Sequence, residues 1–274
     1  MITSALLSLV VAGGAASGIR FSHDFDDALK KARSQKKPLM VDFWAEWCGW
    51  CHRLDKTTYV DPEVVKMAQG FLAVKVNTEG SVKDAEIAQR YDVTSLPTIL
   101  FVSPGGRQLV RVNGFQGPGR FPRTLERAKE TAVKVIGWEQ ALEKDANDPS
   151  ALAALGTHLF EQEFFDESRD LLQQAARLDG ESLATTRRHT RMLLAIIQNY
   201  DRKYAEAEAL LKEGLAITPL GEDEPKLLFI LGRTYMKWGR AADARRLMQK
   251  IVSDHAQSAM AEKAREQLQL LANK

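Results

Sequence analysis

The sequence predicts a mixed β-sheet flanked by helices, followed by an all-helical region. Over residues 21–136, short apolar runs alternate with amphipathic stretches, which is typical of strands covered by helices on both faces of a sheet. From residue 149 onward Ala, Leu, Glu, Gln, Lys and Arg dominate, and only six of the 18 glycines lie beyond residue 150. This composition favours helices, and a length of 274 residues is sufficient for two domains.

Four segments of the first region have the pattern of strands. Three are apolar runs of the kind that forms buried strands, namely Pro38–Trp44, Phe71–Asn77 and Thr98–Ser103. The fourth, Arg107–Gly114, follows a Pro-Gly-Gly turn and is expected to form a hairpin with the third. Helical spacing predicts helices over residues 22–35, 49–58, 61–69, 82–91 and 122–135.

The helical region, residues 149–274, contains an internal repeat. Similar segments begin at Pro149, Arg188 and Pro225, which are 39 and 37 residues apart (188 − 149 and 225 − 188). Small residues recur at matching places in each segment, as the pairs Gly156 and Ser168, Ala195 and Ala207, and Gly232 and Ala244. Because small residues are required where two helices cross closely, the pattern predicts helical hairpins, with residues 256–272 as a closing helix.

The repeated segments resemble tetratricopeptide repeats. QEFFDESRDLLQQAARLD, RKYAEAEALLKEGLAITP and WGRAADARRLMQKIVSD each look like the turn and second helix of such a unit, which is roughly 34 residues long. The resemblance implies a surface for a protein partner. A generic array of helical hairpins without a peptide groove is the alternative, and no pair of Asn or Lys side chains stands out as a clamp for a carboxylate.

Composition and charge exclude several classes of protein. The chain is 45% hydrophobic and 27% charged, which excludes a disordered chain and a multi-span membrane protein. Its 38 basic and 36 acidic residues give a net charge of +2, and no basic run with interleaved aromatic residues is present. We therefore expect no nucleic-acid partner.

The first 20 residues are expected to be a secretory signal peptide. No charged residue occurs from Ile2 to Ile19, and the apolar run Ala5–Ala12 leads into small residues, with a cut expected after Ala16. Export would place the protein in the periplasm or elsewhere outside the cytoplasm. Because no Lys or Arg precedes the apolar run, an uncleaved N-terminus on a cytoplasmic protein is the alternative.

The chain has only two cysteines, Cys48 and Cys51, and three of its five tryptophans, Trp44, Trp47 and Trp50, lie close to them in sequence. One close pair can neither staple a fold with several disulfides nor supply four thiolates to zinc. The pair follows a predicted strand and falls in the first turn of the next predicted helix. At such a position free backbone N–H groups and the helix dipole lower the pKa of a thiol and make it a nucleophile.

A Cys-x-x-Cys motif can be a redox pair, half of a zinc site or, because His52 follows, a site of haem attachment. The strand that precedes the motif does not fit an all-helical haem protein, and no second pair of ligands is present for zinc. A redox-active Cys48–Cys51 disulfide is therefore favoured, and we expect no metal and no other cofactor.

Several motifs carry a resemblance to thioredoxin. Residues 40–51, MVDFWAEWCGWC, resemble its active-site segment VDFWAEWCGPC, with Trp50 in place of the proline. Residues 91–101, YDVTSLPTILF, resemble the segment whose proline is cis, and residues 112–115, VNGF, the strand that follows. Residues 58–64 and the KPLMVDFWAEWC and SLPTILF segments are most similar to the C-terminal periplasmic domain of the disulfide reductase DsbD and its small soluble relatives. The resemblance covers about residues 24–135 and implies a thioredoxin fold.

The resemblance also implies a role for each residue near the dithiol. Cys48, exposed at the helix start, would attack a substrate disulfide, and the more buried Cys51 would resolve the mixed disulfide. Asp42 is a carboxylate in an apolar strand, which costs desolvation free energy. By resemblance it is the buried acid that takes the proton from Cys51, with its pKa raised by burial. Lys75 matches a lysine that pairs with this acid, and a solvated lysine at the strand edge is the alternative.

A substrate-binding surface is implied beside the sulfurs. The Leu96–Pro97 peptide would be cis and would offer the backbone of Leu96 to an extended substrate, with Trp47, Gly49 and Trp50 completing the surface. Trp50 in place of proline leaves the reduction potential open. His52 either stabilises the Cys48 thiolate or is an exposed helix residue.

We therefore expect a thiol-disulfide oxidoreductase that reduces or exchanges protein disulfides, with a helical-repeat module that binds a protein partner. Its other partners would be disulfide-bearing protein substrates and an upstream thiol reductase that donates electrons, by resemblance a membrane reductase. A redox-sensing tetratricopeptide adaptor without catalytic turnover is the alternative. The expected domains are residues 21–136 and 149–274, joined by a linker over residues 137–148.

Overall fold

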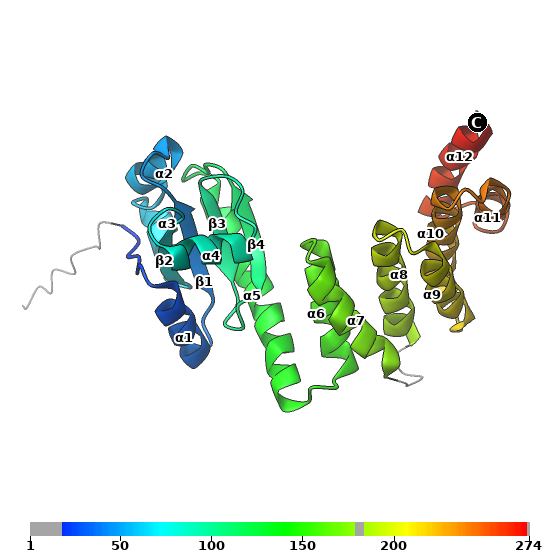
Figure 1. Cartoon of the computed structure of the whole chain (residues 1–274), viewed down its shortest axis with the longest axis horizontal. Helices are drawn as coiled ribbons and strands as arrows, with labels where there is room; N and C mark the ends of the chain where they lie inside the picture. Colours follow the sequence, from blue (N-terminus) through cyan, green and yellow to red (C-terminus); the bar gives the residue numbers. More distant parts are fainter. Residues whose placement is uncertain (1–17, 179–183, 273–274) are drawn as a thin grey trace, which may run out of the picture. The chain divides into compact units, whose positions relative to one another are not determined.

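The computed structural model describes residues 18–178 and 184–272. The chain divides into two compact units, one that ends at Ile136 (unit 1) and one that begins at Gly137 (unit 2), and each is described separately (Figure 1). The signal peptide is expected over residues 1–20, and its residues 1–17 lie outside the described ranges. No helix within the described ranges is long and apolar enough to span a membrane.

Unit 1 is built on a four-stranded mixed sheet. The strands are β1 (Leu39–Trp44), β2 (Leu72–Asn77), β3 (Thr98–Val102) and β4 (Gln108–Asn113), in the order β2-β1-β3-β4. β1 runs parallel to β2 and antiparallel to β3, and β3 and β4 form the expected hairpin. The strands lie within one residue of their predicted bounds, because short apolar runs between turn residues leave little freedom in placing them.

Helices cover both faces of this sheet. They are α1 (Phe25–Gln35), α2 (Gly49–Arg53), α3 (Pro62–Ala68), α4 (Val82–Arg90) and α5 (Phe121–Lys144). Side chains of α1 and α4 pack with Val41 and Phe43 of β1 in one core. Alternate residues of a strand point to opposite faces, so Asp42 projects to the other face. There Phe121 of α5 packs near Phe101 of β3, with ring centroids 6.4 Å apart.

One predicted helix and the predicted linker differ from the observed structure. The helix predicted over residues 49–58 is α-helical only in α2 and continues as a π-helical turn, η1 (Leu54–Thr58), in which the N–H of Tyr59 donates to the carbonyl of Leu54 (2.9 Å). The expected linker over residues 137–148 is helical as far as Lys144. Leu142 packs against the buried core of unit 2, and this burial extends the helix where polar composition predicted a linker.

Unit 2 consists of three helical hairpins and a closing helix. The hairpins are α6 (Pro149–Glu161) with α7 (Phe165–Arg177), α8 (Ala184–Tyr200) with α9 (Tyr204–Ala216), and α10 (Glu224–Lys237) with α11 (Ala241–Asp254). A 3-10 turn, η3 (Gly221–Asp223), precedes α10, and α12 (Ala259–Ala272) closes the unit. Each hairpin turn has a residue with positive φ at the same register position: Glu163 (65°), Arg202 (60°) and Gly239 (82°).

The small residues of the repeat lie where the helices of a hairpin meet. Ser168 is fully buried, and its hydroxyl donates to the carbonyl of Gly156 at 2.8 Å. A Cβ atom on Gly156 would lie 2.8 Å from Cγ of Leu172, and one on Gly232 would lie 2.6 Å from Cε of Met248. The predicted close approach within the hairpins is therefore present.

Gly156→Val is expected to lower the free energy of unfolding by about 1–3 kcal/mol, because the added side chain overpacks the α6–α7 contact against Leu172. The control is Gly137→Ala, at an exposed helical position with no atom near the added Cβ, which should be neutral or stabilise by up to about 1 kcal/mol. Urea unfolding of both variants measures the difference. Equal unfolding midpoints would contradict the packing described for α6 and α7.

Candidate active site

The dithiol lies at the junction of β1 and α2. Cys48 and Cys51 form a disulfide with their Cα atoms 5.3 Å apart. Cys48 is the N-cap of α2, and its sulfur accepts a hydrogen bond from the backbone N–H of Cys51 (3.2 Å). A donor at this position stabilises negative charge on the Cys48 sulfur, as the sequence predicted for the nucleophile.

The exposure expected for Cys48 is not observed in the disulfide form. Cys48 is 3% exposed and Cys51 is 0% exposed, so both are buried. Only the expectation that Cys51 is the more buried of the two agrees with the structure. The disulfide explains this, because it turns the Cys48 sulfur toward the fully buried Cys51 and toward that residue's N–H group.

A buried carboxylate and a lysine pair across strands β1 and β2. Asp42 is 0% exposed, and it is the register partner of Lys75. Nζ of Lys75 lies 3.3 Å from a carboxylate oxygen of Asp42. This placement favours the role expected for Lys75 over that of a solvated strand-edge residue, because the ammonium group is buried beside the acid.

A second carboxylate, Asp55, completes the cluster. Asp55 lies in the π-helical turn η1, and its carboxylate accepts a hydrogen bond from Nζ of Lys75 at 2.5 Å. The Asp55 side chain is 39% exposed, whereas that of Asp42 is 0% exposed. Lys75 therefore bridges a fully buried acid and one that reaches solvent.

Aromatic rings enclose the ammonium group of Lys75. Nζ lies 5.3 Å from the ring centroids of both Phe21 and Trp44 and 5.8 Å from that of Tyr59. These rings exclude water from the lysine while their faces stabilise its positive charge. Asp42 consequently has a fixed cation next to it but little solvent.

Burial sets the protonation of Asp42. Loss of hydration raises the pKa of its carboxyl from 3.8 to about 6, against the opposing attraction of Lys75, and the nearby charge of Asp55 raises it further. Burial and the charge of Asp42 also raise the pKa of Tyr59 well above its usual value. A carboxyl with a pKa near 6 can accept and release a proton close to neutral pH, which suits a general acid and base.

Asp55 was missed by the sequence analysis. Its neighbours predict a regular, exposed helix, and only the π-helical turn together with the register of Lys75 brings its carboxylate into the cluster. π-helical turns occur frequently at functional sites, but the local sequence Leu-Asp-Lys-Thr-Thr carries no signal for one.

Asp55→Asn is expected to lower the pKa of Asp42 below about 6, because it removes a repulsive charge and leaves Lys75 to pair with Asp42 alone. A pH titration of the Asp42 carboxyl carbon by NMR measures the shift. Glu130→Gln, on the exposed side of α5, is the control and should leave the titration unchanged. An unchanged or raised pKa in Asp55→Asn would contradict the coupling.

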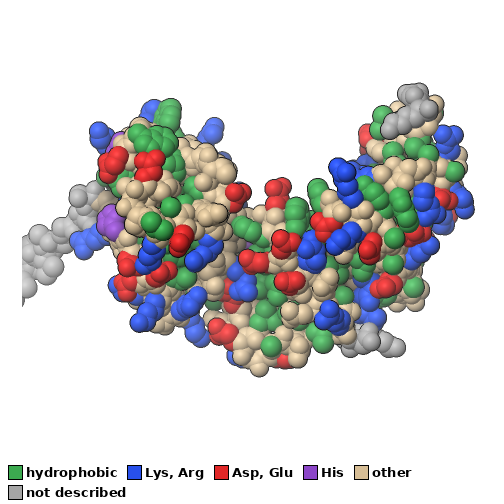
Figure 2. Space-filling model, viewed as in Figure 1, with side chains coloured by type: hydrophobic (Ala, Val, Ile, Leu, Met, Phe, Trp, Pro, Cys, Tyr) green, Lys and Arg blue, Asp and Glu red, His purple; other side chains and the backbone are tan. Residues whose placement is uncertain are grey.

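Two exposed tryptophans flank the disulfide. Trp47 is 68% exposed and Trp50 is 54% exposed, and Figure 2 shows hydrophobic side chains gathered at the α2 end of unit 1. The indole N–H of Trp47 donates to the carboxylate of Glu79 (2.8 Å). Gly49 has no atom near its Cα on the side where a Cβ would lie, so the surface between the tryptophans is open.

The remaining predicted residues lie as follows. The Leu96–Pro97 peptide is cis, and the carbonyl of Pro97 accepts a hydrogen bond from the N–H of Gly114 (2.8 Å). The side chain of Leu96 packs against the core that contains α1 and α4. His52 contacts the backbone carbonyl of Glu46 through Nε2 (2.8 Å), so its ring has a partner other than a sulfur.

No metal-binding cluster accompanies this site. Among residues 18–178 and 184–272, no group of three or more His, Cys, Asp or Glu side chains is arranged to hold a metal ion. The described side chains offer a disulfide at the start of α2 and a buried acid on the preceding strand β1.

The fold and the dithiol together define a class of domain. Residues 25–129 match the family described as Thioredoxin-like domain, so this part of the chain is a thioredoxin-like domain and the predicted thioredoxin fold is confirmed. The segment is similar to thiol:disulfide interchange protein DsbD of Colwellia psychrerythraea, with 36% identity over 100 residues that cover 35% of this chain and 16% of that protein.

Two further relatives extend the comparison. DsbD of Photorhabdus laumondii is 34% identical over 97 residues, which cover 34% of this chain and 17% of that protein. The chain thus spans about a sixth of the length of these relatives. The solved C-terminal domain of Neisseria meningitidis DsbD in the oxidised form is 24% identical with a TM-score of 0.34, and the match covers 40% of this chain and 99% of that domain.

Proposed function

We propose that the protein is a thiol-disulfide oxidoreductase that reduces protein disulfides through Cys48 and Cys51. The observation that carries the proposal is the Cys48–Cys51 disulfide at the start of α2, next to the strand that holds the buried Asp42. The similarity of this segment to proteins named thiol:disulfide interchange protein supports it.

The reaction transfers two electrons from the dithiol to the substrate. The Cys48 thiolate attacks one sulfur of the substrate disulfide, which forms a mixed disulfide and releases one substrate thiolate. The Cys51 thiol then gives its proton to the Asp42 carboxylate and attacks the Cys48 sulfur. The second substrate thiolate leaves and is protonated, and the Cys48–Cys51 disulfide remains, which is the form that the structure describes.

A second thiol reductase must return two electrons to this disulfide after each turnover. We place the protein outside the cytoplasm, in the periplasm or an equivalent compartment, on the basis of the uncharged, partly apolar residues 2–19 and the DsbD-like segment. There a membrane reductase is the expected donor, because soluble NADPH-linked systems lie inside the cell.

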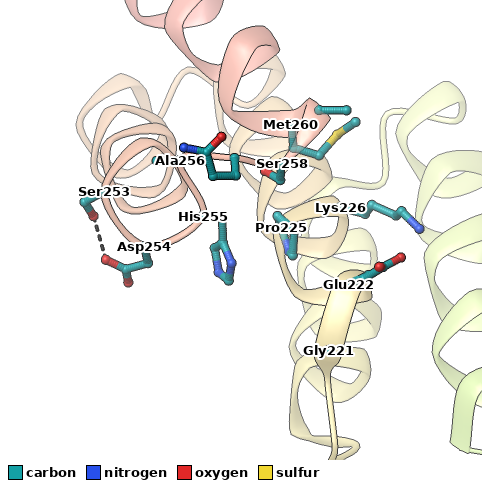
Figure 3. A pocket seen from close by; sticks show the side chains of 12 residues that line it. Gly221, Glu222, Pro225, Lys226, Ser253, Asp254, His255, Ala256, Ser258 and Met260 are labelled. Carbon is teal, nitrogen blue, oxygen red and sulfur yellow. Dashed lines mark hydrogen bonds between the residues drawn. The ribbon is translucent and has the colours of Figure 1, made fainter.

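Unit 2 is proposed to bind a protein partner as a tetratricopeptide-like array. The equivalent turns at Glu163, Arg202 and Gly239 support the repeat. One hollow of this unit measures about 720 Å³ and lies between η3, the start of α10 and the connection from α11 to α12 (Figure 3). His255 projects into it, and Glu222, Lys226 and Asp254 also line it, so this hollow carries charges of both signs.

A smaller pocket of about 120 Å³ between α8 and α10 has clearer chemistry. The amide N–H of Asn199 donates to the hydroxyl of Thr234 (2.9 Å), and its carbonyl oxygen is buried without a hydrogen-bond partner. Arg233 and Lys237, one turn apart on α10, line the same pocket, and no described acid pairs with them. Arg233 and Lys237 suit a peptide carboxylate, and Asn199 lines the same pocket from a different hairpin, so the sequence alone does not reveal the set.

A Cys51→Ser variant tests the proposed function. Without the resolving thiol, substrates are expected to stay bound to Cys48 as mixed disulfides that a reductant releases and mass spectrometry identifies. The control is Cys48→Ser, which should capture nothing. A Cys51→Ser protein whose Cys48 thiol reacts with an alkylating reagent but which captures no protein in its native compartment would contradict the reductase.

A further inference from the structure

An arginine stacks on the aromatic surface beside the disulfide. The guanidinium carbon of Arg53 lies 5.2 Å from the ring centroid of Trp50 and 5.0 Å from that of Phe115. The two rings are themselves 5.4 Å apart, with 37° between their planes. Trp50 lies between the two cysteines in the chain, so these three side chains form a cationic platform (Trp50, Arg53 and Phe115) adjacent to the sulfurs.

The platform is held from two separate segments of the chain. Arg53 ends α2, one turn after Trp50, whereas Phe115 follows β4 and comes directly after Gly114. The hydrogen bond from Gly114 to the carbonyl of Pro97 fixes the start of this loop, and Gly114 has a positive φ of 83° that favours glycine. The position of Phe115 is thereby coupled to the segment expected to contact substrate.

The charge of Arg53 has no acidic partner. Its side chain is exposed, and none of the ion pairs among the described residues includes it. The stacking on two rings holds the guanidinium in place without neutralising it, because aromatic faces leave the N–H edges free for hydrogen bonds. A planar guanidinium with free N–H edges matches a carboxylate with two hydrogen bonds.

The other exposed tryptophan near the disulfide lies next to the opposite charge. Trp47 contacts the carboxylate of Glu79, which is exposed, so the two tryptophans lie next to charges of opposite sign. A substrate segment that contacts both tryptophans therefore meets a cation next to Trp50 and an anion next to Trp47. Such a charge pattern fixes the direction of a bound segment and discriminates between substrates.

We propose that Arg53 is a specificity-determining residue that selects substrates with an acidic side chain next to the attacked cysteine. The carboxylate pairs with the guanidinium of Arg53 while the neighbouring sulfur reacts with Cys48. This inference rests on the proposed function of the dithiol, and it assigns to that site a substrate class, acidic disulfide-bearing segments. Arg53 acts on binding and orientation and takes no part in electron transfer.

The test uses the reduced full-length protein and three peptides that carry a thionitrobenzoate leaving group on their single cysteine. The residue next to that cysteine is Asp, Asn or Lys, and release of the coloured thiol gives kcat/KM. Each value is divided by the rate of the same peptide with dithiothreitol, which removes the effect of the neighbouring charge on the intrinsic reactivity of the disulfide.

The wild type is expected to prefer the Asp peptide over the Lys peptide by about tenfold, the effect of about 1.4 kcal/mol from one charge-assisted pair. Arg53→Gln should bring the ratio of the normalised rates for the Asp and Lys peptides close to one. Arg53→Glu should reverse the preference, and the control Arg127→Gln, an exposed arginine of α5, should retain it.

Two kinds of failure are distinguishable. Equal normalised rates for all three peptides in the wild type, or a preference that persists in Arg53→Gln, would overturn the role of Arg53 while the oxidoreductase stands. A wild type that reduces none of the peptides would contradict the oxidoreductase and, with it, this inference.

Discussion

Cys48→Ser is expected to reduce the rate of insulin disulfide reduction, with dithiothreitol as electron donor, by at least about 100-fold. The substitution removes the thiolate that forms the mixed disulfide. In the wild type, Cys51 then attacks that mixed disulfide within the same protein, at an effective concentration that free thiols do not reach. Precipitation of the reduced insulin chains, followed by turbidity, measures the rate against the uncatalysed reaction.

Cys51→Ser serves as the matched variant in the same assay. It should turn over more slowly than the wild type but faster than Cys48→Ser, because Cys48 still attacks and dithiothreitol must then release the substrate in place of Cys51. A Cys48→Ser protein that retained more than a tenth of the wild-type rate would contradict the assignment of the nucleophile.

Asp42→Asn is expected to stabilise the protein and to slow catalysis. Burial raises the pKa of Asp42 from 3.8 to about 6, so the folded state holds its proton more tightly than the unfolded state does. Between these two pKa values the free energy of unfolding falls as the pH rises, and this loss of stability is complete above pH of about 6. Asparagine carries no charge, so at about pH 7 the variant should gain up to about 3 kcal/mol at 1.36 kcal/mol per pKa unit.

The pH dependence separates this effect from a change in packing. The difference in unfolding free energy between Asp42→Asn and wild type should shrink as the pH falls from about 6 to below 3.8, because the wild-type carboxyl is then protonated in both states. Turnover at about pH 7 should fall at least about tenfold because the Cys51 thiol loses its base. A stability difference that does not change with pH would contradict the buried, ionised carboxylate.

Much of the fold follows from local pattern. The three apolar runs and the Pro-Gly-Gly turn predict the strands and the hairpin, because those signals depend on neighbouring residues alone. The end of α5 does not follow in this way. Residues 137–144 are polar enough for a linker, and they stay helical because Leu142 finds an apolar partner in unit 2, a contact that no local pattern contains.

The residues of the site likewise include some that the sequence indicates and others that it does not. Cys48, Cys51 and Asp42 are evident from the sequence because a dithiol and an isolated carboxylate in an apolar strand are unusual there. Asp55 and Arg53 are not evident, since each looks like an ordinary polar residue of a helix. Their contacts depend on the π-helical turn and on the loop that carries Phe115, which bring together segments far apart in the chain.

The most direct test of the central claim, that Cys48 and Cys51 form one redox centre, is a single-turnover experiment with the reduced protein and a disulfide-bearing protein substrate, without any other donor. Quenching with an alkylating reagent and mass spectrometry counts the free thiols on both molecules. We predict that one Cys48–Cys51 disulfide forms for each substrate disulfide reduced. Reduction of the substrate while both cysteines remain alkylatable, or no reduction at all, would contradict the account.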